Sequence, residues 1–481
     1  MNRMIFFAAC LAVFMVSVEA TIVATAIPTI VGDLGGLRLF SWVFGIYLLT
    51  QAVTIPIYGR LADIYGRKKL ITVAITLFLI GSILSGFSHN MVMLIIYRGL
   101  QGLGAGGVMP IASTIVGDIY TGAARAKVQG YLSSAWGFSA ITGPLIGAFL
   151  IAHTGWPTIF WLNVPFGILC LFVIARFFDE RVEQHNHSID YLGSLLLAGG
   201  TGTLMFVLVM LGNIPATLAM VLAIVAVVLI ACLIAHELHT PEPMMPLRLY
   251  RLRVIAIANS GNFAIGTLSI GITAFLPTYV QGAMGLPAVL AGSTLGITAA
   301  SWTTGSLIAS RIVHRVTYRA MVTFGSMLLI TGSLFLVTLE PDRSIWWALA
   351  GGTILGLGFG FVNLVFVVTT QAAVAWQQRG AATASNQFMR QLGSSIGTAA
   401  FAAVFNLGLY RRLPNAGDVV TRMMDPRTRG SLPPAEIAHY AAAISGSLHG
   451  IFIMLGLLGF VVLGLALGLP AKLNASDPTP A

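Results

Sequence analysis

The sequence predicts an all-α integral membrane protein that crosses the bilayer many times. Of its 481 residues, 57% are hydrophobic and only 9% are charged, whereas a soluble domain carries roughly 25% charged residues. Apolar segments long enough to span a bilayer, about 20 residues each, recur along the whole chain. The three cysteines lie far apart within apolar segments, so they indicate neither a disulfide nor a metal site.

The apolar segments predict fourteen transmembrane helices, each ending at a charged residue or at a Gly or Pro. The helices are expected to begin near Met4, Leu39, Leu70, Met91, Val128, Thr158, Tyr191, Ala216, Val254, Leu286, Ala320, Ile345, Ala381 and Ala442. We expect an N-terminal six-helix bundle (residues 1–178), an inserted two-helix hairpin with its cytoplasmic connections (residues 179–250), and a C-terminal six-helix bundle with a short tail (residues 251–481).

A weak internal repeat supports this division. Residues Ile57–Leu84 can be laid over Ile308–Phe335, and the glycines of Gly102–Gly106 over those of Gly356–Gly360. Many carriers are built from such repeats, with two bundles around a central substrate site. Chance similarity between Gly-rich apolar helices is the alternative.

The basic residues predict that both termini are cytoplasmic, because short cytoplasmic connections collect Lys and Arg. With the N-terminus inside, the cytoplasmic segments hold 17 of the 26 Lys and Arg residues, namely Arg3, Arg60, Arg67, Lys68, Lys69, Arg125, Lys127, Arg176, Arg181, Arg248, Arg251, Arg253, Arg311, Arg315, Arg319, Arg379 and Lys472. The outside holds Arg38, Arg343 and five arginines in one long connection, for which the rule makes an exception. The net charge of +10 therefore reflects topology and not nucleic-acid binding.

The first apolar segment, Leu11–Pro28, contains one carboxylate, Glu19. An ionisable side chain near the middle of a span costs roughly 2.5 to 3.5 kcal/mol on insertion scales, so such residues usually face a polar cavity and have a function there. The alternative is an acid held only by a structural partner. The many-span setting favours the functional interpretation, because a proton-coupled carrier needs such an acid.

The loop Gly59–Lys69 has the sequence GRLADIYGRKK. Two glycines permit a tight turn, Asp63 can cap a helix N-terminus, and Arg67 can bind a carboxylate through two hydrogen bonds. A basic cluster that only fixes topology does not account for Asp63. The loop resembles the signature loop between spans 2 and 3 of the major facilitator superfamily, matched here by Gly59, Leu61, Asp63, Gly66, Arg67 and Lys68.

This resemblance implies the major facilitator fold of two six-helix bundles, with two extra central helices in this chain. It also implies a conformational latch. In similar transporters the Asp caps a helix of the other bundle, and the Arg meets an acid at the end of span 4, here Asp118. The implied latch residues are Gly59, Asp63, Gly66, Arg67, Lys68 and Asp118.

Two further motifs narrow the resemblance. Tyr97–Pro110, YRGLQGLGAGGVMP, resembles the family's span 4 motif, whose arginine, here Arg98, lies in the membrane. The span 5 antiporter motif, G-x(8)-G-x(3)-G-P-x(2)-G-G, is matched at Gly130, Gly143, Pro144 and Gly147. Ser139 and Ala148 replace two of its glycines. Both are small enough for close helix packing, but the departure leaves uptake open beside export.

Segments near both ends of the chain resemble the fourteen-span drug:proton antiporters of the EmrB/QacA type. They are Glu19–Val23 with Ala26–Pro28, and Arg390–Ala399, RQLGSSIGTA. That branch typically carries Asp in the span 1 motif. Glu19 keeps the carboxyl group and lengthens its reach by one methylene, which puts the geometry in question more than the role.

Glu19 and Arg98 are expected at nearly the same depth in the membrane. At 1.5 Å per residue, Glu19 lies roughly 22 Å above the cytoplasmic start of its span and Arg98 roughly 10 Å below the outer start of its own. In a hydrocarbon core about 30 Å thick these levels nearly coincide. We expect Arg98 to modulate proton binding by Glu19; a pair kept only for structure is the alternative.

Other polar residues within the spans are candidates for lining a substrate cavity. Arg390 either lines the cavity or hydrogen-bonds backbone carbonyls. For most of the amides, bonds between packed helices are the commoner role. The amide candidates are Asn259, Asn262, Asn363, Asn386 and Gln387.

The expected function is secondary active transport and not catalysis. We expect a proton-coupled antiporter that exports amphiphilic small molecules by alternating access, as in multidrug efflux. The alternative is proton-coupled transport of lipids, siderophores or a single metabolite, including uptake. An enzyme would need a catalytic constellation, and the sequence contains neither HExxH nor a P-loop.

The expected driving force is a proton gradient, without a cofactor or metal. The expected location is the inner membrane of a bacterium. The expected partners are amphiphilic substrates, protons and membrane lipids but no nucleic acid, with a periplasmic adaptor and an outer-membrane channel as further candidates.

Overall fold

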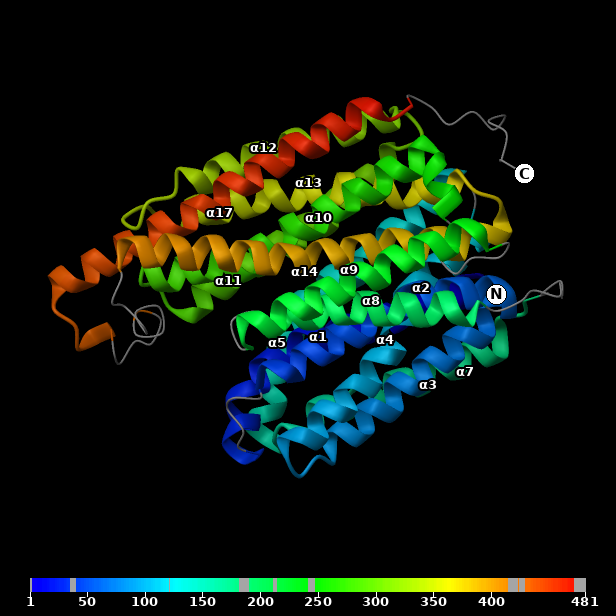
Figure 1. Ribbon diagram of the computed structural model, residues 1–481, viewed down its shortest axis with the longest axis horizontal. Helices are drawn as coiled ribbons and strands as arrows, with labels where there is room; N and C mark the ends of the chain where they lie inside the picture. The colour runs from blue at the N-terminus through cyan, green and yellow to red at the C-terminus, as the bar shows by residue number, and fades with distance from the viewer. Residues whose placement is uncertain are drawn as a thin grey trace. The chain divides into compact units, whose positions relative to one another are not determined.

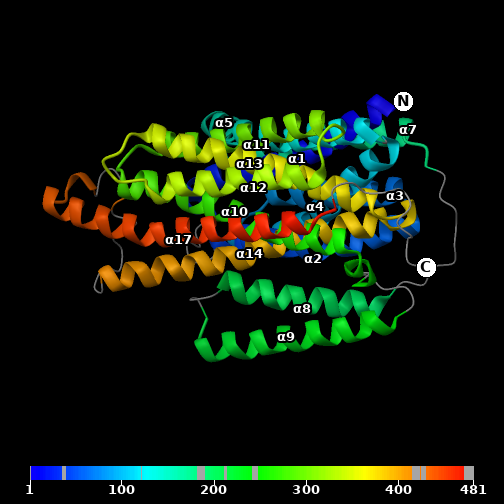
Figure 2. The same cartoon turned by 90° about the horizontal axis from the view of Figure 1, so that it is seen from above.

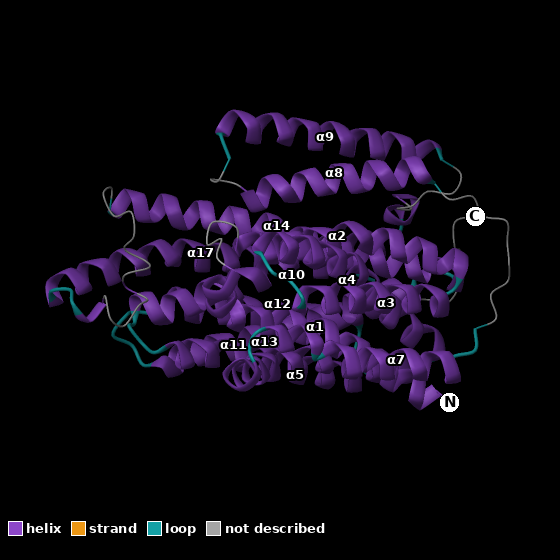
Figure 3. Cartoon of the chain, turned by 90° about the horizontal axis from the view of Figure 1, so that it is seen from below, coloured by secondary structure: helices purple, strands orange, loops and turns teal. Residues whose placement is uncertain are grey.

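The computed structural model describes residues 2–34, 40–120, 122–180, 190–210, 214–240, 247–413, 423 and 429–470. Within these ranges the chain is helical apart from short connections, and it forms no strand (Figure 3). The described residues divide into two compact units. Unit 1 comprises those within 1–259 and 367–388, and unit 2 those within 260–366 and 389–472.

Figure 1 shows the helices of unit 1. In chain order they are α1 (Asn2–Leu34), α2 (Phe40–Tyr65), α3 (Arg67–Gly86), α4 (Met91–Ile119), α5 (Gly122–Thr154), α6 (Pro157–Trp161), α7 (Asn163–Phe177), α8 (Tyr191–Met210) and α9 (Ala216–His239), followed by the short turn η2 (Leu247–Arg251).

Three of the remaining helices run from one unit into the other: α10 (Arg253–Thr278), α13 (Ile345–Ala372) and α14 (Arg379–Arg412). The others are the π-helical turn η3 (Tyr279–Ala283), α11 (Ala288–Ile312), α12 (Tyr318–Val337), the turn η4 (Trp376–Gln378) and α17 (Pro434–Gly468).

Nine helices of the described residues are long and apolar enough to cross a membrane. Thirteen of the fourteen predicted starting points fall within a helix or within two residues of one. The other, Leu39, lies outside the described residues. The number of spans nevertheless stays a prediction, because length and composition single out nine. The all-helical, multi-span fold class is confirmed.

The span predicted to begin near Thr158 is found as Pro157–Phe177, a stretch long and apolar enough to cross a membrane. Its two helices α6 and α7 meet at Leu162, whose φ of −53° and ψ of −33° are still helical. Pro165 lies in the first turn of α7 and has no backbone N–H, so it cannot bond to the carbonyl of Trp161 four residues earlier. Asn163 takes the first position of α7.

Glycines allow α4 to approach its neighbours closely. A methyl group at Gly102 would collide with the carbonyl oxygen of Tyr47 on α2, and one at Gly104 with that of Ala74 on α3. In unit 2, Gly356 of α13 lies in the same way against the carbonyl oxygen of Thr298 on α11. Small residues are the usual means of close helix contact in membranes. Each unit thus contains one helix packed through the glycines that the internal repeat matched.

Helices α8 and α9 lie side by side as a hairpin, and α8 packs against α2 (Figure 2). Asp190 caps α8 by accepting a hydrogen bond from the backbone N–H of Gly193 at 2.7 Å. The same carboxylate oxygen lies 2.8 Å from Nε2 of His236 on α9. This contact ties the two helices together at one end.

Two clusters of buried apolar side chains flank Glu19 along α1. One contains Val16 with residues of α3, α4 and α7, and the other contains Val18 and Ile22 with Leu94 of α4. Glu19 therefore lies between apolar layers in the interior of unit 1, where an unpaired charge would be strongly unfavourable.

Candidate functional site

Glu19 and Arg98 form an ion pair with no exposed side-chain surface. Arg98 Nη1 lies 2.5 Å from Glu19 Oε1, and both side chains are 0% exposed. The same nitrogen donates to Gln101 Oε1 at 2.6 Å, and Arg98 Nε donates to the carbonyl of Val43 at 3.2 Å. The guanidinium carbon lies 4.2 Å from the centre of the Tyr47 ring, a favourable cation–π contact. The structure thus brings together the two residues that their depth in the membrane placed at one level.

Asn163 holds the second oxygen of the Glu19 carboxylate. Its Nδ2 donates to Glu19 Oε2 at 2.6 Å and also lies 3.0 Å from Ser82 Oγ and 3.3 Å from the carbonyl of Phe160. Sequence reasoning missed Asn163. The signal that could have found it is an amide directly before a Val-Pro pair within an otherwise apolar span.

The span 5 antiporter motif lies on α5 and packs against α1, the helix that carries Glu19. Ser139, which replaces a motif glycine, donates through Oγ to the carbonyl of Phe14 at 3.2 Å. Thr21 Oγ1 donates back to the carbonyl of Ser139 at 3.3 Å. The motif glycines Gly130, Gly143 and Gly147 are buried. The side chains of Pro144 and Ala148 lie outside the described residues.

The signature segment 59–69 is not a loop throughout. Gly59 to Tyr65 continue α2, and the turn is confined to Gly66, whose φ of 91° favours glycine. The expectation that Gly59 serves the turn is therefore wrong. Gly59 instead lies where a methyl group would collide with the Cβ of Ala384 on α14, so it allows close helix approach.

Asp63 caps the N-terminus of α14 from the last turn of α2. Its Oδ1 accepts from the backbone N–H of Gly380 at 3.1 Å, and its Oδ2 from that of Ala381 at 2.8 Å. These N–H groups belong to the first turn of the helix, where no partner exists within the helix itself. The negative carboxylate also interacts favourably with the positive end of the helix dipole.

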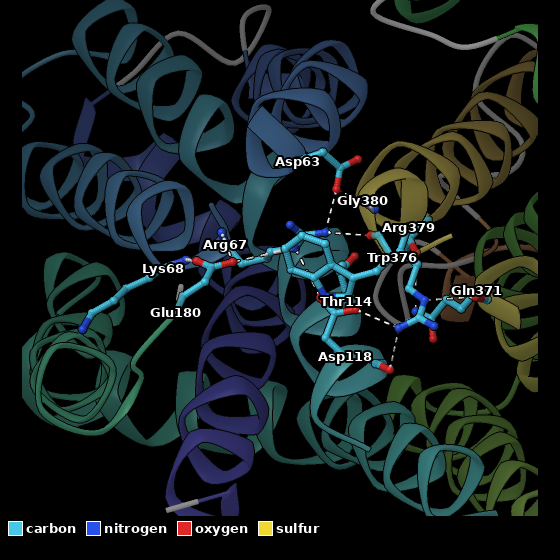
Figure 4. A network of polar contacts seen from close by, with 12 residues as sticks. Asp63, Arg67, Lys68, Thr114, Asp118, Glu180, Gln371, Trp376, Arg379 and Gly380 are labelled. Atoms are coloured by element: carbon cyan, nitrogen blue, oxygen red, sulfur yellow. Dashed lines mark hydrogen bonds and ion pairs between the residues drawn. The ribbon is translucent and has the colours of Figure 1, made fainter. Parts of the chain in front are cut away.

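Arg67 lies at the centre of a network of carboxylates that Figure 4 shows from close by. Its Nη2 donates to Asp63 Oδ1 at 2.8 Å, and its Nε lies 3.3 Å from Asp118 Oδ2. Nη2 also donates to the carbonyl of Trp376 at 3.1 Å, and the guanidinium carbon lies 4.1 Å from that indole ring. Only 1% of the Arg67 side chain is exposed. The structure therefore joins three of the four charged residues expected in the latch, and Lys68 is the exception.

Glu180 is a further member of this network that sequence reasoning missed. Its two carboxylate oxygens accept from the backbone N–H groups of Arg67 at 2.9 Å and Lys68 at 2.8 Å, which caps the start of α3. The Lys68 side chain points away from the centre, and its Nζ donates to the carbonyl of Ala175 at 3.1 Å (Figure 4).

Arg379, at the first position of α14, shares Asp118 with Arg67. Its Nη1 lies 3.1 Å from Asp118 Oδ1, and its Nε donates to the carbonyl of Gln371 at 3.3 Å. Asp118 thus holds two arginines, one on each carboxylate oxygen. We call Asp63, Arg67, Asp118, Glu180, Trp376 and Arg379 the helix-end network.

Two of the expected cavity residues contact each other. Asn386 Nδ2 donates to Asn259 Oδ1 at 3.2 Å, and Asn259 Nδ2 donates to Ser385 Oγ at 3.0 Å. These bonds join α10 to α14, so they favour a packing role. Ser385 also pairs with the Tyr250 hydroxyl at 2.9 Å, and burial raises the pKa of that hydroxyl above its usual value. Asn262 and Gln387 are buried, and Asn363 and Arg390 are half-buried.

A carboxyl group can take up and release a proton, whereas an arginine stays charged. The buried pair therefore contains one group able to change its charge. Among the described residues, no three His, Cys, Asp or Glu side chains are grouped so that they could hold a metal ion.

Comparison with known proteins identifies relatives along most of the chain. The multidrug transporter protein MdtP of Bacillus subtilis (strain 168) is 32% identical over 441 residues, which cover 91% of this chain and 80% of that protein. Multidrug resistance protein 3 of the same organism is 30% identical over 463 residues, which cover 92% and 90%.

The fold has solved counterparts. The human organic anion transporter MFSD10 (TETRAN) aligns with a TM-score of 0.65 over 95% of this chain and 99% of its own, at 15% identity, which is a likeness of fold alone. A family model described as the Major Facilitator Superfamily matches residues 9–398. The chain therefore belongs to the major facilitator superfamily of membrane transporters.

Proposed function

We propose that the chain is a fourteen-span proton-coupled antiporter of the EmrB/QacA type, which exports amphiphilic small molecules by alternating access. Glu19 is the proton carrier and Arg98 its modulator. Family membership and the two relatives named as multidrug proteins support the substrate class.

The observation that carries the proposal is the fully buried Glu19–Arg98 pair. Protonation of Glu19 would cancel its charge and leave Arg98 without a counter-charge, which is unfavourable in a buried site. Protonated Glu19 and ionised Glu19 paired with Arg98 are therefore stable in different surroundings. A carrier that binds proton and substrate alternately needs such a pair of states.

The helix-end network supplies the latch in this scheme. Asp63 and Arg67 hold the start of α14 and the backbone before it, so breaking these contacts would free that helix end. Coupling between the latch and the Glu19 pair would let proton binding bias one conformation over another.

The remaining parts of the proposal concern the membrane setting. We place residues 1–178 and 251–481 as two bundles around residues 179–250, in the inner membrane of a bacterium with both termini cytoplasmic. The proton gradient drives transport without a cofactor. A periplasmic adaptor and an outer-membrane channel are candidate partners.

The test is substrate-induced proton release from the purified full-length protein in weakly buffered detergent. The lipophilic monocation tetraphenylphosphonium serves as the substrate probe. Wild-type protein should release protons when the probe is added, and Glu19→Gln should not, because its amide does not ionise near neutral pH. Asp33→Asn is the matched control on the same helix. Asp33 lies near the opposite end of α1 from the N-terminus and accepts from Trp156 Nε1 at 2.9 Å, so its loss should leave proton release intact.

Undiminished release from Glu19→Gln would reject Glu19 as the proton carrier. Direction is tested separately in proteoliposomes with an imposed pH gradient. Movement of the probe against the proton flux supports antiport, and movement with it would establish uptake instead.

A further inference from the structure

Asn163 contacts the Glu19 carboxylate at Oε2, whereas the ion pair with Arg98 is made at Oε1. Arg98 approaches Oε1, and Asn163 Nδ2 approaches Oε2 at 2.6 Å. The three atoms around Nδ2 are a carboxylate oxygen, a hydroxyl oxygen and a carbonyl oxygen, and all three accept hydrogen bonds. The amide therefore presents its N–H groups, and not its oxygen, to Glu19.

The surroundings fix this orientation. Ser82 Oγ donates to the carbonyl of Phe160 at 2.7 Å, which leaves its lone pairs to accept from Asn163 at 3.0 Å. Asn163 itself is 2% exposed and stands where α6 meets α7. The donor is thus held by Ser82 of α3 and Phe160 of α6, while its target lies on α1.

We propose that Asn163 is a positioning residue for proton exchange: by donating to Glu19 Oε2 it favours the deprotonated carboxylate and sets the pH at which Glu19 binds its proton. This inference rests on the proposed function of Glu19 as proton carrier and names a residue that regulates it.

The physical reason is the change that protonation makes at Oε2. A deprotonated oxygen accepts from Asn163, whereas a protonated oxygen becomes a donor and opposes the N–H that faces it. Hydrogen bonding to the charged form of an acid favours that form. Because protonation also weakens the attraction of Arg98, the two partners act in the same direction, one through each oxygen.

The experiment follows the protonation of Glu19 directly, without a substrate. Infrared difference spectra of the purified full-length protein in detergent are recorded as a function of pH, and the carbonyl band of protonated Glu19 is identified by its absence in Glu19→Gln. Asn163→Leu keeps nearly the same shape and removes the donor. It should move the midpoint of the Glu19 band upward by about one pH unit, a tenfold rise in proton affinity.

Ser85→Ala is the matched control. Ser85 is buried on α3 one turn from Ser82, and its hydroxyl donates only within its own helix, to the carbonyl of Gly81 at 2.8 Å. This variant should keep the wild-type midpoint, so a shift in Asn163→Leu cannot be ascribed to any loss of a buried polar group in this region.

A pair of compensating substitutions provides a second test in case Asn163→Leu does not fold. Glu19→Asp withdraws the carboxylate by one methylene and Asn163→Gln extends the amide by one. Glu19→Asp alone should titrate at a higher pH than the double variant, in which the bond is restored.

The role of Asn163 would be overturned if Asn163→Leu kept the wild-type midpoint and Glu19→Asp titrated at the same pH as the double variant. That outcome is distinct from failure of the proposed function, which shows itself as normal substrate-induced proton release in Glu19→Gln whatever Asn163 does.

Discussion

The interior pair and the helix-end network are both built from acids and arginines of unit 1, yet they bind different kinds of partner. Glu19 is held by side chains, among them those of Arg98 and Asn163. Asp63 and Glu180 instead accept from backbone N–H groups at the starts of α14 and α3. The interior pair is sealed from solvent, whereas Asp118 in the network is 14% exposed.

This difference separates two tasks. A carboxylate held by side chains can change its protonation while the backbone stays in place, because only rotamers need to adjust. A carboxylate that caps a helix cannot lose its contacts without releasing the end of that helix. We infer that the first arrangement suits proton exchange and the second suits conformational locking, and three experiments test the distinction.

The largest expected effect is at the interior pair. Arg98→Ala leaves Glu19 buried without its counter-charge, which typically costs about 3–5 kcal/mol of folding stability. Unfolding in detergent, measured by loss of helical circular dichroism with denaturant, should show this loss. The double variant Glu19→Gln/Arg98→Met should recover most of the stability but no proton release. Wild-type stability of Arg98→Ala would contradict a tightly paired interior site.

An intermediate effect is expected at the network. Arg67→Ala or Asp118→Ala removes charge-assisted contacts of about 1.5–3 kcal/mol each, enough to change a two-state population tenfold or more. Transport of tetraphenylphosphonium in proteoliposomes should fall, while its binding in detergent is largely retained. Arg315, an exposed arginine near the end of α11, provides the control Arg315→Ala. Normal transport by both network variants would show that segment 59–69 only fixes the orientation of the chain in the membrane and does not act as a latch.

The smallest expected effects separate the backbone cap from its neighbour. Glu180→Ala removes both acceptors at the start of α3 and should cost about 0.5–2 kcal/mol, the usual value of a helix cap. Lys68→Ala removes a side chain that is one-third exposed, so its effect should stay below about 1 kcal/mol. Denaturant unfolding of the two variants side by side provides the measurement. An equal or larger loss of stability in Lys68→Ala would show that the Glu180 cap is not the main contact that stabilises the start of α3.

Much of this arrangement follows from local sequence. Apolar length predicts the helices, and the rise per residue places Glu19 and Arg98 at one level because both spans are continuous up to these residues. Asp63 could be assigned to a helix cap because an acid between two glycines is unusual in a basic connection. In each case the determining feature is a property of one helix or one short segment.

The rest depends on contacts between distant segments. Asn163 meets Glu19 from 144 positions away, and a hydropathy pattern does not report which buried amide faces the acid. Glu180 meets Arg67 from 113 positions away, and Asp63 meets Gly380 from 317 positions away. The sequence places Gly59 in a turn because glycine permits one, but the same absence of a side chain also permits close packing, and only the fold decides between them.

The interior pair also bears on how the chain is made. Its two members are 79 residues apart, and the acid on α1 is synthesised first. A lone arginine in the middle of a span costs roughly 2.5 to 3.5 kcal/mol to insert. When α4 leaves the ribosome, Glu19 is already available to offset that cost. A Glu19→Gln chain should therefore integrate α4 later in a translation-coupled insertion assay, so the residue that we assign to proton exchange would also set the order of membrane assembly.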